Sequence, residues 1–270
     1  MNLRTKAIIT TVMFSFVYLI LQIVDLGKVF SIDQDVLKAF IVSILFLFGL
    51  YWVLGFKIKG IRIITILAYS SYLVFIMSLF LELVIFKNVG RISEKTLSLI
   101  ILIIYAFGVY FLILTMNILN KSYVSRIPLA QAAKAANFLY TLIASYFSFL
   151  IILRSGIDFY FKVIIFTLVI FLLTLNLFWF KKESRRQLFG ETNAVVVIMV
   201  LLFLVLLMWP LSVELSTMFF TIVFYILLGL GLEERETTSP LMSFEYIVLL
   251  IIAVFLLLKL TTWGINSSLI

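Results

Sequence analysis

The chain has 270 residues, of which 64% are hydrophobic and only 13% are charged, and its formal net charge is +8. Soluble domains carry about 25% charged residues, so a water-soluble fold of this length could not bury so much apolar surface. The sequence contains no Cys and no His. These absences exclude disulfides, thiolate nucleophiles, Ser-His-Asp hydrolases, and zinc or haem sites that depend on His.

Uncharged apolar stretches of about 18–25 residues follow one another along the chain, and each can cross about 30 Å of hydrocarbon as an α-helix. They predict an all-α transmembrane helix bundle with nine spans, or alternatively eight or ten. The predicted spans are residues 7–24, 38–56, 62–86, 96–119, 135–154, 162–180, 193–212, 215–232 and 243–263. Because the connections are short, we expect a single integral membrane domain over residues 1–270 with no extramembrane domain.

The distribution of basic residues predicts the orientation of these spans. With the N-terminus inside, the inner connections carry more Lys and Arg than the outer ones, which places the N-terminus in the cytoplasm and the C-terminus outside. The positive charge fits anionic lipid headgroups, and no basic run interleaved with aromatic residues indicates nucleic acid. Compact loops and abundant Ile, Phe and Lys favour a prokaryotic plasma membrane. The expected partners are the lipid bilayer and other membrane proteins.

Three acidic residues lie near the ends of predicted spans. Asp33 and Asp35 form an Asp-x-Asp pair before the second span. Such pairs bind a divalent metal in some membrane glycosyltransferases, but Asp33 could equally cap the helix that starts near Asp35. Glu82 lies near the outer end of the third span. We expect its carboxylate to snorkel to the membrane interface, with a functional intramembrane carboxylate as the alternative. We expect no cofactor and no metal site.

The fifth span carries a stripe of small and weakly polar residues that recur every three or four positions. The stripe consists of Ala133, Asn137, Thr141, Ala144 and Ser148. Small faces let helices approach closely and hydrogen-bond across the contact, so we interpret this face as a packing surface. The alternative is that it lines a substrate path. Similar stripes include Thr65, Tyr69 and Tyr72 in span three, and Tyr105 and Gly108 in span four.

Three functions fit these features. The scarcity of mid-span charge and of catalytic side chains favours a non-enzymatic membrane subunit, sensor or assembly factor that works through partners. A carrier or flippase for a small or lipidic substrate is the first alternative, and the small face of span five permits it. The second alternative is a membrane enzyme that acts on lipid-linked substrates through Asp33, Asp35 or Glu82.

Overall fold

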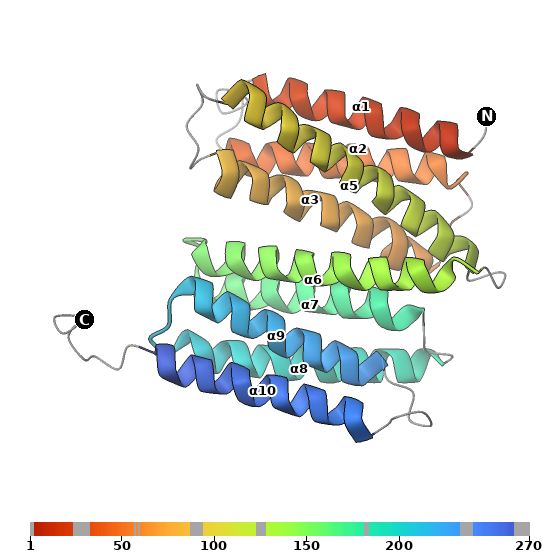
Figure 1. The fold of residues 1–270 in the computed structure, drawn as a ribbon. Helices are drawn as coiled ribbons and strands as arrows, with labels where there is room; N and C mark the ends of the chain where they lie inside the picture. The colour runs from red at the N-terminus through yellow and green to blue at the C-terminus, as the bar shows by residue number, and fades with distance from the viewer. Residues whose placement is uncertain are drawn as a thin grey trace. The chain divides into compact units, whose positions relative to one another are not determined.

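All regular secondary structure in the described part of the chain is helical, and this part contains no strand. The structure is a computed structural model, described here for residues 3–23, 33–56, 58, 60–86, 94–122, 128–180, 184–232 and 240–261. The helices are α1 (Leu3–Ile23), α2 (Gln34–Val53), α3 (Tyr69–Phe80), α5 (Glu94–Ser122), α6 (Ala130–Arg154), α7 (Phe159–Trp179), α8 (Arg185–Leu207), α9 (Val213–Leu232) and α10 (Pro240–Leu260) (Figure 1). The π-helical turns η2 (Ile63–Ala68) and η3 (Leu81–Phe86) extend α3 at both ends.

The helices agree with the prediction of an all-α membrane bundle. Within the described residues, eight helical segments are long and apolar enough to cross a membrane. Helix α10 lies where the ninth span is predicted and is not among those eight. Large apolar side chains on the outer faces, such as Phe48 and Phe107 at 63% and 60% exposure, suit contact with lipid rather than water. The protein is therefore an integral membrane protein.

Local sequence signals explain several helix boundaries. Asp33 is the N-cap of α2, and its side chain accepts a hydrogen bond from the backbone N–H of Asp35. Ser184 caps α8 by accepting from the N–H of Gln187, so this helix begins eight residues before the predicted span at 193. Gly55 and Gly60 lie between α2 and η2 and have positive φ angles of 74° and 66°, which glycine adopts readily.

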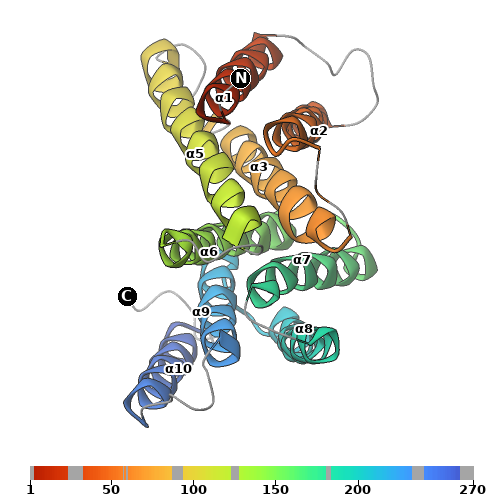
Figure 2. The ribbon, with the colours of Figure 1, turned by 90° about the vertical axis from the view of Figure 1, so that its right-hand side faces the viewer.

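The contacts divide the chain into two compact units, and unit 1 covers Met1–Ala144. In unit 1, α1 contacts α2 and α5, and α3 also contacts α2 and α5, so the four helices form a closed ring of neighbours (Figure 2). Gly49 permits a close approach of α2 to α1, because a Cβ there would lie 2.7 Å from Cγ2 of Thr10. The segment Ile63–Leu83, which contains α3, is the most enclosed of the eight spans at 61% buried.

Unit 2 covers Ser145–Ile270 and contains the second part of α6 with α7 to α10. Its core is a cluster of phenylalanine side chains that are all fully buried, and Phe166 and Phe203 stack with ring centroids 4.1 Å apart. The cluster consists of Phe149, Phe166, Phe203, Phe220 and Phe224. Its residues come from α6, α7, α8 and α9, so these aromatic contacts hold the four helices together.

Candidate functional site

Glu82 lies inside unit 1 and not at its surface. The residue belongs to η3, and its side chain is only 6% exposed. The hydroxyl of Tyr18 on α1 donates a hydrogen bond to Oε1 of Glu82, with an O···O distance of 3.2 Å. The carboxyl group is thus enclosed by neighbouring helices about one turn before the end of the span, which is the position from which the sequence predicts that it reaches the membrane interface.

The hydroxyl groups of Tyr105 and Ser78 lie close to the Tyr18–Glu82 pair. The ring of Tyr18 lies against that of Tyr105 on α5, with centroids 5.0 Å apart. The hydroxyl of Tyr105 is 2.7 Å from Oγ of Ser78, which lies four residues before Glu82. All of these side chains are buried. We call Tyr18, Ser78, Glu82 and Tyr105 the Glu82 cluster; it joins α1, the end of α3 and α5.

A buried cation is present at the same end of the helix ring. Lys38 lies near the start of α2 and is only 4% exposed. Helices α2 and α3 are consecutive antiparallel neighbours, so the start of α2 and the end of η3 lie at one end of the pair (Figure 1). Lys38 and Glu82 therefore lie at the same end of unit 1.

The chemistry of the Glu82 cluster is that of oxygen ligands around one carboxyl group. A carboxyl group with hydroxyl groups close by offers oxygen atoms that can bind a proton or a small cation. Divalent Ca²⁺ and Mg²⁺ take about six or more oxygen ligands, usually with several carboxylates. Within the described residues, no three His, Cys, Asp or Glu side chains are grouped so as to hold a metal ion. Ionisable groups enclosed in a membrane bundle commonly mark ion or proton sites.

The Asp33 and Asp35 pair lies at the start of α2. Asp33 is exposed, and its Oδ1 accepts the hydrogen bond from the N–H of Asp35 at 3.3 Å. This is the capping arrangement that the sequence offered as the alternative to a metal site. The structure gathers no further acid at the pair within the described residues.

The predicted face of span five is buried along its whole length. Ala133, Asn137, Thr141, Ala144 and Ser148 are each at most 4% exposed. Tyr69 on α3, which is fully buried, lies against the part of this face in unit 1. Its hydroxyl is 2.7 Å from Oγ1 of Thr141 and donates to the carbonyl oxygen of Asn137 at 3.4 Å. These contacts are those of a packed interface between α3 and α6 that hydrogen bonds stabilise.

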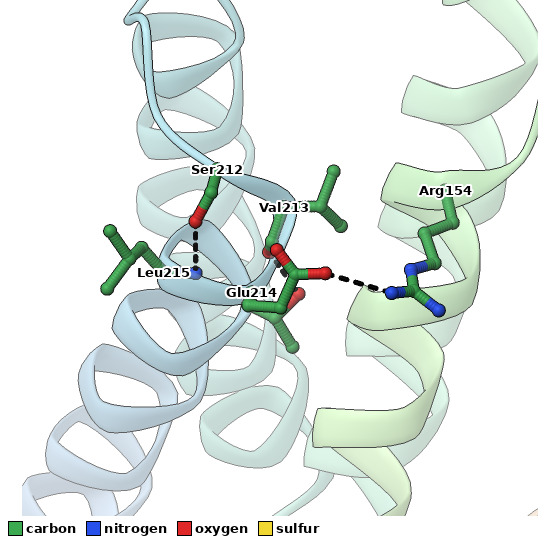
Figure 3. A network of polar contacts seen from close by, with 6 residues as sticks. Arg154, Ser212, Val213, Glu214 and Leu215 are labelled. Atoms are coloured by element: carbon green, nitrogen blue, oxygen red, sulfur yellow. Dashed lines mark hydrogen bonds and ion pairs between the residues drawn. The ribbon is translucent and has the colours of Figure 1, made fainter. Parts of the chain in front are cut away.

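Unit 2 has an ion pair at the end of α6. A guanidinium nitrogen of Arg154 lies 2.9 Å from Oε1 of Glu214 on α9 (Figure 3). Oγ of Ser212 accepts a hydrogen bond from the N–H of Leu215, which caps the start of α9 beside this pair. The two charged side chains are 49% and 56% exposed, so water and salt screen their attraction. The pair suits a structural contact between helix ends of opposite dipole.

Sequence reasoning singled out Glu82 but missed Tyr18 and Ser78, which belong to the same cluster. Each is an isolated polar residue in an apolar span, and its partner lies on another helix or on a neighbouring turn. Comparisons with protein families, curated proteins and solved structures find no match to this chain. The inference of function therefore depends on the Glu82 cluster itself.

Proposed function

We propose that the protein is a membrane carrier that couples the movement of a solute to the binding and release of a small cation at Glu82. The observation that supports this proposal is the burial of an ionisable side chain, at 6% exposure, inside a membrane-spanning unit. Removing a carboxylate from water is costly unless a positive charge compensates it. In the proposed cycle a cation binds at Glu82, and its release makes the carboxylate available again.

The backbone around Glu82 also supports a functional role. Glu82 belongs to a π-helical turn, and a second π-helical turn precedes α3. Turns of this kind are rare in proteins and are frequent at functional sites, because they interrupt the regular hydrogen bonding of an α-helix. A carboxyl group that must bind and release a ligand benefits from such a locally adjustable backbone.

The sequence alone favoured a different hypothesis, a membrane subunit, sensor or assembly factor, and the carrier was its first alternative. A subunit or assembly factor was preferred because the spans carry little internal charge, yet Glu82 and Lys38 are both buried in unit 1. The enzyme hypothesis relied on catalysis by Asp33, Asp35 or Glu82. These acids do not form a group of three in the described residues.

We further propose that the protein lies in a prokaryotic plasma membrane with its N-terminus in the cytoplasm. The excess of Lys and Arg in the inner connections supports this orientation. In it, the third span leaves the cytoplasm at Ile63 and reaches the outer side near Phe86, so the Glu82 cluster lies toward the outer half of unit 1.

Charge movement in reconstituted membranes tests the carrier. The full-length protein is placed in liposomes on a solid-supported membrane, and either the Na⁺ concentration or the proton concentration is raised in a step. We expect a transient current with the native chain and its loss in Glu82→Gln. The matched control is Glu214→Gln, which makes the same chemical change at an exposed acid in unit 2 and should keep the current.

Two results would contradict the proposal. One is a native chain that gives no current with either cation. The other is a current that Glu82→Gln leaves unchanged while the variant is folded and reconstituted at the native level.

A further inference from the structure

We infer that the solute of the proposed carrier is an anion, and that its carboxylate or phosphate group binds to Lys38. This inference names the chemical class of the solute and rests on the proposed function. It depends on the burial of Lys38, on the lack of a counter-charge for its ammonium group in the described part of the chain, and on its position in unit 1.

Lys38 lies on the face of α2 that points into unit 1. The side chain is only 4% exposed, and the buried stripe of α2 continues from it with Val42 and Phe46. Residues four positions apart share one face of a helix. Val36 and Phe40, at 36% and 54% exposure, form the outward side of the same turns. Lys38 is therefore directed toward the neighbouring helices of α2, which are α1 and α3.

No side chain of the described residues neutralises Lys38. The nearest acid on α2 is Asp35, one turn earlier, and it is half-exposed. Neither an ion pair nor a hydrogen bond links Lys38 to Asp35, to Glu82 or to any other described residue. An ammonium group that leaves water without a counter-charge destabilises a folded protein. A negatively charged ligand at Lys38 supplies that counter-charge.

Two sources can provide a phosphate group at this position, a dissolved solute and an anionic lipid. Lysine side chains near helix ends can extend to lipid headgroups. Lys38, however, belongs to the buried stripe of α2, whereas the side that faces lipid at this level carries Val36 and Phe40. This placement favours a solute that enters unit 1 over a lipid that lies along its surface.

An anion at Lys38 also fits the cation proposed for Glu82. The two residues lie at the same end of unit 1, at the start of α2 and in η3 (Figure 1). A singly charged anion and a singly charged cation together add no net charge to the unit. Coupling them therefore limits the charge that has to pass through the hydrocarbon region, where unbalanced charge is costly.

The thermal stability of the full-length protein in a neutral detergent tests the inference. The probes are sodium phosphate and sodium acetate, each compared with sodium chloride at the same Na⁺ concentration and pH. We expect at least one probe to raise the unfolding temperature of the native chain, by about 3 °C for each tenfold increase above its dissociation constant. In Lys38→Met this shift should be lost, because the charge that holds the anion is gone.

Lys162→Met is the matched control. Lys162 also lies near the start of a membrane-spanning helix, α7, but it is less buried, and its ammonium group donates to the carbonyl oxygen of Leu153 at 3.5 Å. The control variant loses the same charge and should keep the native shift. If Lys38→Met does not fold, Lys38→Gln takes its place in the comparison.

Three results would overturn the inference. One is a native chain that responds to neither probe, and another is a folded Lys38 variant that keeps the native shift. The third is a Lys38-dependent stabilisation by phosphatidylglycerol added to the micelles, with no effect of phosphate or acetate. That result would identify a lipid headgroup as the partner of Lys38.

The two proposals fail in different ways. A Lys38-dependent shift with phosphate or acetate, without any transient current after a cation step, would support the anion site and contradict the carrier. A Glu82-dependent current in a chain whose stability responds to neither probe would support the carrier and overturn the anion.

Discussion

Gly231 on α9 lies against the aromatic ring of Phe178 on α7, and the structure leaves no room there for a methyl group. A Cβ atom at Gly231 would lie 2.9 Å from Cε1 and 3.2 Å from Cε2 of this ring. The Phe178 side chain is fully buried, so its ring cannot turn outward to relieve the contact. We expect Gly231→Ala to destabilise unit 2.

The size of the effect follows from two opposing contributions. Alanine is more favourable than glycine inside a helix by about 1 kcal/mol. Adding a methyl group to a filled core costs about 1–3 kcal/mol. Gly190 in α8 of the same unit is the matched control, because nothing lies within 4 Å of a Cβ placed there. The difference between Gly231→Ala and Gly190→Ala therefore isolates the steric cost, which we expect to be about 1–3 kcal/mol.

Titration with sodium dodecyl sulfate in mixed micelles measures the free energy of unfolding of each variant. A second substitution, Phe178→Leu, shortens the side chain that opposes Gly231. The double variant should be less destabilised than the sum of the two single variants. The added methyl group meets the Phe178 ring in Gly231→Ala, but it meets a shorter side chain in the double variant. Equal stabilities of Gly231→Ala and Gly190→Ala, or strictly additive effects of the pair, would refute the contact.

Two further predictions concern the helix interface in unit 1 and the orientation in the membrane. Thr141→Val removes the hydroxyl that pairs with Tyr69, and it should lower the free energy of unfolding by about 0.6 kcal/mol in the same titration. Unchanged stability with an altered transient current would instead favour a substrate path along α6. Because the native chain has no Cys, Gly156→Cys should react with an impermeant maleimide outside intact cells, and Arg185→Cys only after lysis. The reverse pattern would invert the proposed orientation.

Hydropathy predicted the spans well because it identifies apolar segments that are long enough to cross the hydrocarbon core of a membrane. The third span was predicted at residues 62–86, and its helix covers Ile63–Phe86. The start of α8 was missed because its first two turns are polar and begin at the Ser184 cap, outside the apolar stretch. The π-helical turns were also missed. They are defined by backbone hydrogen bonds from each N–H to the carbonyl five residues earlier, and the hydropathy of the side chains does not report this pattern.

The candidate site was predictable only in part. The capping role of Asp33 followed from local sequence, because a capping side chain and the backbone N–H that donates to it lie within a few residues. Glu82 stood out as an acid in an apolar span, but its burial depends on contacts with α1 and α5. The hydrogen bond from Tyr18 joins residues 64 positions apart, and a single sequence without periodic polar residues gives no sign of such a pairing.

The π-helical turns at the two ends of α3 bear on how this chain can change length during evolution. Each such turn closes its hydrogen bonds over one more residue than an α-helical turn. Loss of one residue from Ile63–Ala68 would let that turn close as an α-helix and leave the 12 residues of α3 in register. A deletion inside Tyr69–Phe80 would rotate part of its buried face by about 100°. We therefore expect insertions and deletions among descendants of this gene to gather at the turns and to spare α3.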